Sequence, residues 1–235
     1  EFATIPQELL APIPASLDFV TAAGIPLAAL TAMQALRDEM HLGPGSRVFI
    51  PAGSGGVGTF AIQIAKWLGA EVITTASPRG RDLVTRLGAD QVIDYTAERF
   101  EDHTGVVDAV FDLIGGETLI SSFGIVKPRG IVVSVAALPE PQTAIKDLDR
   151  GLGLAALFWF ASIPLRWRAW RKGVRYRFLF MHPSGAELAE IGDLVESKKI
   201  EPVIDKVFSL ANVDDAFAYL ESGRAKGKVV VKIAD

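Results

Sequence analysis

The sequence predicts an α/β fold in which helices cover both faces of a parallel sheet. From residue 47 to residue 136, short runs of β-branched and aromatic residues alternate with stretches of helical period. This alternation is typical of strand–helix–strand units, in which crossover helices join parallel strands. The runs 48–50 and 131–133 are apolar throughout, as expected for strands that are buried on both faces.

The predicted elements follow this alternation along the chain. Residues 1–20 contain three prolines and are expected to form a short extended piece and a surface linker. Residues 19–40 have helical spacing that a glycine and a proline interrupt. The predicted strands are 47–50, 71–75, 91–94, 106–113 and 130–136, and the predicted helices between them are 58–68, 80–87 and 118–126.

After about residue 180 the organisation changes. Residues 185–197 and 213–220 have helical spacing, whereas 202–210 and 228–233 are expected to be strands. We expect this tail to be added beside the main sheet rather than to continue it.

Composition limits the classes of function. The chain has 235 residues, of which 49% are apolar and 22% charged, as in ordinary soluble globular proteins, and we expect a cytoplasmic location. The net charge of −4 gives no reason to expect a nucleic-acid partner. The chain has no cysteine, which excludes a disulfide scaffold, a cysteine-ligated zinc lobe and a thiol nucleophile within these residues.

A Gly-rich segment lies between the first predicted strand and the helix that follows it. Gly53, Gly55 and Gly58 satisfy the pattern G-x-G-x-x-G. The glycines of this pattern allow a sharp turn, a close approach of backbone to a pyrophosphate, and close packing of the helix on the sheet. The free N–H groups of the first helical turn then bind the phosphates. A merely tight turn is the alternative, but it does not explain the position at a first strand–helix junction.

The end of the next predicted strand distinguishes NAD from NADP. An NAD site usually has an Asp or Glu there, which bonds both ribose hydroxyls. In this sequence residues 74–81 contain no acid but do contain Ser77, Arg79 and Arg81, which suit a 2′-phosphate. Solvated surface charge is the alternative explanation for the two arginines. The residues favour NADPH as the cofactor.

Four spaced segments carry a resemblance to a known superfamily. They are the Gly-rich 52–58, Leu-Gly-Ala-Asp-x-Val-Ile-Asp-Tyr at 87–95, Phe-Asp-x-x-Gly-Gly at 111–116 and Gly-Lys-Val-Val-Val at 227–231. Together they resemble the medium-chain dehydrogenase/reductases, and within them the zinc-independent quinone oxidoreductase (zeta-crystallin-like) branch. The resemblance implies a Rossmann-type doubly wound parallel sheet with N- and C-terminal pieces of a GroES-like catalytic domain.

The resemblance also divides the chain. Residues 1–20 would be the end of the GroES-like catalytic domain and a linker, 21–182 the NADP-binding Rossmann domain, and 183–235 a C-terminal segment that returns to the catalytic domain. Relatives begin with the rest of the GroES-like domain, which forms one wall of the active-site cleft and which this chain is expected to lack. We therefore expect this chain alone to bind cofactor but to be poorly active or inactive.

For the cofactor phosphates, the resemblance implies contacts from the Gly-rich turn and from the ends of the next two strands. The turn residues that would hold the pyrophosphate are Ser54, Gly55, Gly56, Val57 and Gly58. Ser77 and Tyr95 match positions that contact the 2′-phosphate in NADPH-dependent relatives, and Lys228 matches a cofactor-side lysine in the closing motif. Tyr95 also has a plainer explanation, as a residue that caps a strand.

For the ribose and nicotinamide, the resemblance points to other strand ends. The residues at the expected positions are Leu113, Ser134 and Val135. Thr31 matches a threonine beside the nicotinamide, although it would also suit a helix cap. Phe178 and Phe180 resemble part of a strand whose backbone meets the carboxamide and whose edge pairs two subunits, which predicts a homodimer. Both phenylalanines would otherwise be core residues.

A zinc site is not expected. Zinc-dependent relatives place a cysteine shortly before the threonine that matches Thr31, and residues 25–30 offer no metal ligand. His41 and His103 lack metal-ligand spacing, and His182 precedes a proline. Catalysis would then depend mainly on positioning the cofactor's hydride against the acceptor. The sequence assigns no catalytic side chain.

The leading prediction is an NADPH-dependent oxidoreductase that reduces a quinone or an α,β-unsaturated carbonyl. Negative charge that develops on such small hydrophobic acceptors is delocalised and needs only modest hydrogen-bond support. One alternative is a non-catalytic nucleotide-binding interaction protein, because a cofactor fold alone does not prove turnover. The other is a zinc-free, NAD-dependent alcohol-type dehydrogenase, which the missing acid at Ser77 disfavours.

One segment has an unusual composition. Residues 151–186 contain no Asp or Glu, six Arg or Lys residues, and three of the four tryptophans. A lid or a subunit contact is the favoured interpretation, since aromatic residues and Arg are enriched in such contacts. A weak membrane-surface contact through residues 158–177 and a core helix are the alternatives. Nucleic-acid binding by this segment has no supporting motif.

Overall fold

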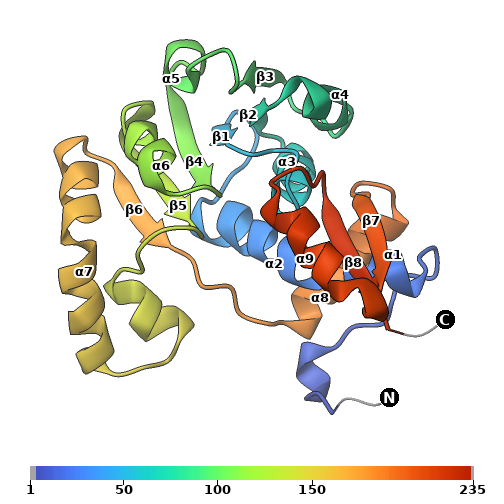
Figure 1. The fold of residues 1–235 in the computed structure, drawn as a ribbon. Helices are drawn as coiled ribbons and strands as arrows, with labels where there is room; N and C mark the ends of the chain where they lie inside the picture. Colours follow the sequence, from blue (N-terminus) through green and yellow to red (C-terminus); the bar gives the residue numbers. More distant parts are fainter. Residues whose placement is uncertain (1–3, 234–235) are drawn as a thin grey trace.

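Six parallel strands form the main sheet of the computed structural model, which describes residues 4–233 (Figure 1). The strands are β1 (Arg47–Ile50), β2 (Glu71–Ala76), β3 (Gln91–Asp94), β4 (Val107–Asp112), β5 (Val126–Ser134) and β6 (Arg175–Phe178). Their order in the sheet is β3-β2-β1-β4-β5-β6, so the chain reverses its direction of travel between β1 and β4. This doubly wound order confirms the predicted α/β fold.

Helices cover the sheet on both faces. They are α1 (Phe19–Ala23), α2 (Pro26–Met33), α3 (Gly58–Trp67), α4 (Pro78–Arg86), α5 (Phe100–His103), α6 (Gly116–Ser122), α7 (Leu152–Arg171), α8 (Gly185–Glu196) and α9 (Val213–Glu221). Short 3₁₀ or π-helical turns lie at Gln7–Leu9 (η1), Gln34–Glu39 (η2), Thr143–Asp147 (η3) and Leu210–Asn212 (η4).

The central strands contribute to two separate hydrophobic cores. Val48 and Ile50 of β1 face a core that α2, α3, α4 and α8 share, whereas Phe49 faces a second core with α6 and the last turn of α7. Val132 and Val133 of β5 divide between the cores in the same way. The apolar runs therefore alternate between two covered faces, as predicted for doubly buried strands.

Most boundaries agree with the sequence, and the differences have tertiary causes. Strand β5 begins at Val126 instead of residue 130 because Val126 pairs with Val107, and this pairing displaces the predicted end of the preceding helix. The helix α5 and the η3 turn were not predicted. The strand that the resemblance implied near Phe178 and Phe180 is Arg175–Phe178, so Phe180 lies beyond its end.

The tail forms a separate sheet beside the main one, as predicted. Strands β7 (Ile204–Ser209) and β8 (Lys228–Lys232) pair in parallel and are not part of the six-stranded sheet. The tail meets the N-terminal piece at two places: the backbone of residues 8–10 packs on Gly185, and the Ser16 N–H donates to the Glu196 carboxylate at 3.0 Å. Figure 1 shows the blue N-terminal piece next to the orange and red tail.

A short backbone segment of the tail, which we call the closing segment (residues 226–228), contacts the Gly-rich turn that follows β1. Gly227 forms an isolated parallel bridge with Gly55, and its N–H donates to the Ser54 carbonyl at 2.8 Å. Gly227 has φ +93°, and a Cβ there would lie 2.4 Å from the Val203 carbonyl oxygen. Only glycine satisfies both the backbone conformation and the close approach.

We predict that Gly227→Ala destabilises the protein more than Gly223→Ala does. Gly223 also has a left-handed φ, of +67°, but nothing lies within 4 Å of a Cβ there. The Gly223 variant should therefore lose only the conformational cost of about 1–2 kcal/mol, and the Gly227 variant at least about 1 kcal/mol more from overpacking. Urea unfolding of the two variants measures the difference. Equal losses would show that Val203 moves aside freely.

Candidate functional site

The Gly-rich turn is held against β2 by hydrogen bonds from its backbone. The Gly53 N–H donates to the Thr75 carbonyl at 3.1 Å, and the Ala52 N–H donates to the Thr75 hydroxyl at 3.0 Å. A Cβ at Gly53 would lie 2.1 Å from Thr74 Oγ1, and a Cβ at Gly58 would lie 2.4 Å from the Ala52 carbonyl oxygen. Both glycines are therefore required, since α3 begins directly against the chain that leaves β1.

The N-terminus of α3 has the electrostatics of an anion site. No side chain caps the helix at Val57, and its first turn contains no acid. Backbone N–H groups at such an end carry a partial positive charge, equivalent to roughly half an elementary charge. The predicted pyrophosphate residues 54–58 form this turn.

Lys228 of the closing segment lies over the turn. Its Cδ would be 2.9 Å from a Cβ at Gly56, so the lysine side chain and the glycine backbone are in close contact. Burial lowers the pKa of the Lys228 ammonium, and among residues 4–233 no carboxylate pairs with it. An unpaired, half-buried cation beside an uncapped helix start favours binding of an anionic group.

The ends of β2 and β3 bring together the residues predicted to contact the 2′-phosphate. Ala76 pairs with Asp94, so Ser77 and Tyr95, one residue further along each strand, leave the sheet side by side. Ser77 is the N-cap of α4, and its side chain makes no capping hydrogen bond. Tyr95 is 61% exposed.

The start of α4 lies next to the Gly-rich turn. A Cβ at Gly80 would be 3.0 Å from Ser54 Oγ, so these two parts of the predicted phosphate site are in contact. Arg79 and Arg81 are exposed on α4. Hydrogen bonds from Thr96 are the main reason that the pKa of Asp94 is lowered, and the charge of Arg81 contributes to the same shift.

Lys226 is a residue of this region that the sequence analysis missed. Its Nζ donates to the Arg79 carbonyl at 2.8 Å, and its N–H donates to Asp205 at 3.1 Å. The closing segment thus connects the tail to the first turn of α4 as well as to the Gly-rich turn. The pattern Lys-Gly-Lys at 226–228 was the available signal, because it places a second cation two residues before Lys228.

The ends of β4 and β5 are fixed by a buried carboxylate that the sequence analysis also left without a role. Asp112 is fully buried and accepts hydrogen bonds from the Gly115 N–H at 2.9 Å and from the Ser134 hydroxyl at 2.6 Å. The predicted site residues Leu113 and Val135 follow these two paired strand ends. The Ser134 hydroxyl is therefore engaged inside the protein, and the Ser134 carbonyl accepts from the Leu179 N–H at 2.9 Å.

The end of β6 is engaged by the η3 segment. The Phe178 carbonyl accepts from the Thr143 hydroxyl at 2.9 Å, and the Phe180 N–H donates to Asp147 at 3.0 Å. Phe178 is half-buried, whereas Phe180 is 53% exposed and is not a core residue. The Phe178 carbonyl and the Phe180 N–H, which the resemblance places near the cofactor's carboxamide, thus already have hydrogen-bond partners within the protein.

A buried ion cluster holds this segment in place. Arg177 is 3% exposed and forms salt bridges with Glu39, Glu140 and Asp147. Burial is the largest single influence on the pKa of Arg177 and lowers it, but Asp147 and the two glutamates outweigh burial, so the pKa is raised. Arg177 therefore remains charged and joins η2 and η3 to β6.

Thr31 lies in the middle of α2 and does not cap it. Its side chain is 7% exposed, and its hydroxyl donates to the Leu27 carbonyl one turn earlier at 2.7 Å. In the part of the chain that the structure describes, the hydroxyl makes no hydrogen bond to another predicted site residue. Residues 4–233 contain no group of three or more His, Asp or Glu residues that could hold a metal ion.

The sheet thus places most of the predicted residues at one end, beyond the carboxyl ends of its parallel strands. The Gly-rich turn, Ser77, Tyr95, Leu113 and Val135 all follow the carboxyl ends of parallel strands. The turn follows β1, next to β4, at the point where the chain reverses the direction in which it adds strands to the sheet. Open α/β sheets bind their ligands at this position.

Comparisons with known proteins identify the family of the chain. A family model described as zinc-binding dehydrogenase matches residues 87–231. The mitochondrial NAD(P)H oxidoreductase RTN4IP1 of Danio rerio is 38% identical over 245 residues, which cover 100% of this chain and 62% of the relative. The 2-methylene-furan-3-one reductase of Solanum lycopersicum is 34% identical and covers 98% of this chain and 51% of its own length.

A solved structure extends the likeness to three dimensions. The quinone oxidoreductase from Coxiella burnetii superposes with a TM-score of 0.79 at 35% identity, over 94% of this chain and 62% of that chain. The chain therefore spans between 51% and 62% of the length of these relatives. With a family match over more than half of its residues, the chain belongs to the zinc-binding dehydrogenase family of the medium-chain dehydrogenase/reductases.

Proposed function

We propose that this chain is the cofactor-binding part of an NADPH-dependent oxidoreductase that transfers hydride to a quinone or an α,β-unsaturated carbonyl without zinc. The observation that carries the proposal is the half-buried Lys228, which has no carboxylate partner in residues 4–233. Lys228 lies over the uncapped start of α3, between β1 and β4, where the strand order of the sheet reverses. The named relatives, a quinone oxidoreductase and a furanone reductase, support the acceptor class.

The residues present fit a dinucleotide. Residues 54–58 and Lys228 would hold the pyrophosphate by backbone N–H groups and one cation. Ser77, Arg79, Arg81 and Tyr95 would surround the 2′-phosphate, because they leave two paired strand ends together.

The nicotinamide half of the cofactor would lie along β4, β5 and β6. Leu113, the backbone of Ser134 and Val135, and the region of Phe178 and Phe180 would line this half, with Thr31 as the remaining implied contact. The cofactor supplies the hydride, and these residues would orient its ring and exclude water. No side chain of this chain is assigned to proton transfer.

Independence from zinc is supported by the residue types. The chain has no cysteine, and its three histidines are at 41, 103 and 182, far apart in sequence. A quinone or enone acceptor suits this donor set, because delocalisation reduces the charge that the protein must stabilise.

The domain boundaries, the subunit contact and the compartment belong to the same proposal. The contacts of residues 8–16 with α8 support a division into 1–20 and 183–235 on one side and 21–182 on the other.

Strand β6 is the last strand of the sheet, so a second copy would pair there to form a homodimer. A cytoplasmic location stays a prediction, since the zebrafish relative is named as mitochondrial.

We predict that Ser77→Asp weakens NADPH binding at least about tenfold, because the new carboxylate would repel the 2′-phosphate. NADH binding should be unchanged or tighter, since a carboxylate suits the free ribose hydroxyls. Calorimetric titration of both cofactors measures the change. Ser184→Asp is the matched control, because Ser184 is the N-cap of α8, away from this site. Equal affinity of the unaltered protein for NADH and NADPH would contradict the NADP assignment.

We predict that Lys228→Met weakens NADPH and NADH equally, about tenfold, because both share the pyrophosphate. The cofactor-free variant should be at least as stable as the parent, since a poorly solvated charge has been removed. Burial depresses the pKa of Lys228, so its charge costs stability below the folded-state pKa, and the cost falls as the pH rises toward the ordinary value of 10.5.

This pH dependence gives the lysine substitution a second readout. Urea unfolding between pH 8 and 10 should show a smaller rise of stability with pH in Lys228→Met than in the parent. Lys199→Met, at an exposed position, should change neither affinity nor pH dependence. A loss of NADPH affinity alone would place Lys228 at the 2′-phosphate instead.

We predict that the intact protein oxidises NADPH with quinones or enones at the same rate after dialysis against a metal chelator. The expected rate is unchanged because no residue set in residues 4–233 could hold a metal ion. Steady-state absorbance of NADPH measures it, with a saturated aldehyde as the contrasting acceptor. Loss of the rate, restored by Zn²⁺, would contradict the zinc-free mechanism, and binding without any turnover would favour the non-catalytic alternative.

A further inference from the structure

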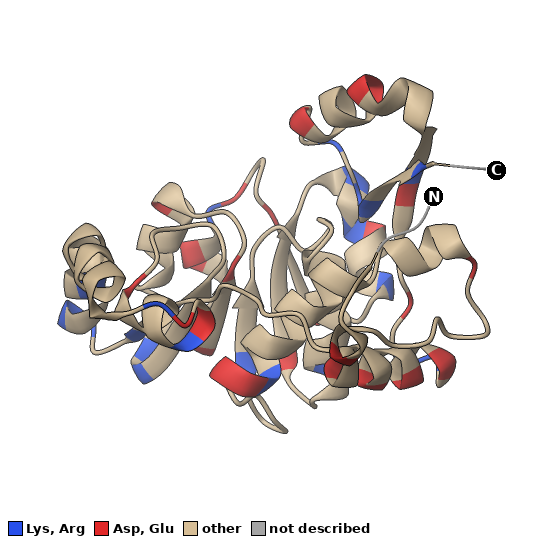
Figure 2. Cartoon of the chain, turned by 90° about the horizontal axis from the view of Figure 1, so that it is seen from below, with Lys and Arg blue, Asp and Glu red and all other residues tan. Residues whose placement is uncertain are grey.

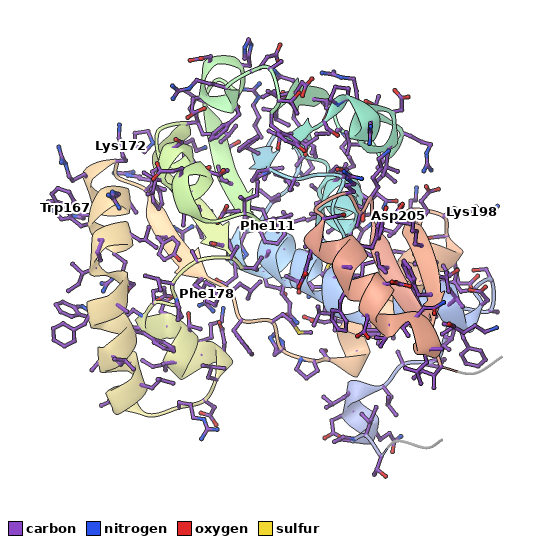
Figure 3. The ribbon with its side chains drawn as sticks, viewed as in Figure 1. Phe111, Trp167, Lys172, Phe178, Lys198 and Asp205 are labelled. Carbon is purple, nitrogen blue, oxygen red and sulfur yellow. The ribbon has the colours of Figure 1, made fainter. Side chains whose placement is uncertain are left out.

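The long helix α7 presents its large side chains to the outside of the molecule. The residues that it buries are small and are spaced by seven, which places them along one line of the helix: Ala155, Ser162 and Ala169. Leu154, Phe158 and Leu165 are half-buried, whereas the other aromatic and large aliphatic residues of the helix are exposed: Leu152, Leu157, Trp159, Phe160, Ile163, Trp167 and Trp170. Figure 3 shows Trp167 pointing away from the sheet.

An ordinary surface helix exposes far fewer large apolar side chains than α7 does. A helix in water buries its large apolar residues and exposes its polar ones. Trp170 is 74% exposed and Leu152 is 80% exposed, so neither a core helix nor a lid that covers its own domain fits these side chains. A contiguous exposed apolar surface of this kind marks an interaction site.

Four cations accompany the apolar residues on α7 or directly after it. They are Arg166, Arg168, Arg171 and Lys172, and within residues 4–233 none of them forms a salt bridge with a carboxylate. Arg166 and Arg171 instead lie over the rings of Trp159 and Trp167, at 5.9 and 4.7 Å from the ring centres. Figure 2 shows blue but no red on α7, and Lys172 projects from its end in Figure 3.

The charge identifies the partner. A second copy placed on this face would bring eight cations together with no carboxylate from α7, since residues 151–186 contain none. An anionic lipid surface supplies the missing negative charge, and tryptophan is enriched at the boundary between headgroups and acyl chains. In residues 4–233 no helix is long and apolar enough to cross a membrane. The helix would therefore lie on the surface.

We propose that α7 binds the surface of an anionic lipid bilayer. The outward tryptophans insert at the level of the headgroups, and the four cations contact lipid phosphates. A hollow of about 400 Å³ between Trp159, Trp167, Trp170 and Tyr176 would receive part of a lipid. This inference is independent of the proposed reductase activity, because none of these residues belongs to the cofactor site.

The first experiment is sedimentation of the intact protein with lipid vesicles. We expect binding to vesicles of phosphatidylcholine mixed with phosphatidylglycerol, and at least tenfold weaker binding to phosphatidylcholine alone. Binding to the mixed vesicles should weaken as salt is added, because exposed charges are screened. Absence of binding, or equal binding to both kinds of vesicle, would overturn the proposal.

Charge reversal on α7 tests the residues. Arg168→Glu combined with Lys172→Glu should lower the partition onto mixed vesicles at least about tenfold. The control is Lys198→Glu with Lys199→Glu, which makes the same change of net charge on exposed residues after α8. If the control loses binding equally, the effect is one of net charge and the assignment to α7 fails. NADPH affinity should be the same in both variants, which separates this test from that of the cofactor site.

Quenching by brominated lipid tests the geometry. Three of the four tryptophans lie on α7, and the fourth, Trp67, lies at the end of α3. Fluorescence of the parent should be quenched by brominated acyl chains, whereas a variant that keeps only Trp67 should not be quenched. If the α7 variants instead change the oligomeric state and quenching is absent, the face is a contact between copies and the lipid proposal is wrong.

Discussion

The contact between the Gly-rich turn and the closing segment is the constraint on which the site depends. A single N–H of Gly227 donates to Ser54, and the bridge to Gly55 fixes the register of the two segments. The residues on either side are thereby directed to different places, Lys226 to the start of α4 and Lys228 to Gly56. The tail therefore contributes Lys228 to the Gly-rich turn and Lys226 to the start of α4. Without this contact, the proposed phosphate-binding region would consist only of a helix start and surface residues.

The ion cluster around Arg177 serves the opposite end of the sheet. It ties η2 and η3 to β6 and occupies the backbone groups of Phe178 and Phe180 that a cofactor would otherwise meet. Removing one partner from such a cluster leaves an uncompensated buried charge and typically costs about 3–5 kcal/mol. The same cluster fixes the chain that leads into α7. The position of α7 is therefore fixed by charge at the segment that leads into it as well as by the packing of Ala169 and Leu165 on the second core.

The sequence was sufficient for features that depend on local period and on glycine geometry. Strands β1 and β3 were predicted with their observed ends, and the Gly-rich turn lies where its pattern placed it. Features that depend on distant partners were missed. Strand β5 starts at Val126 only because Val107 is opposite it. Ser134 was predicted to contact the cofactor, but its hydroxyl donates a hydrogen bond to the buried Asp112 carboxylate. No pattern in the sequence shows that this buried carboxylate needs a donor from Ser134.

The separation of the two halves of the site along the chain has a consequence for how the protein reaches its native state. Ser54 and Gly227 are about 170 residues apart in the sequence, so the contact between them closes a very long loop. Local strand–helix units form before contacts of this range, whose closure entropy must be overcome by interactions already in place. We therefore expect the contact between the closing segment and the Gly-rich turn to form late in folding. A dinucleotide that binds only after this contact has formed would stabilise it, and so couple a late folding step to cofactor supply.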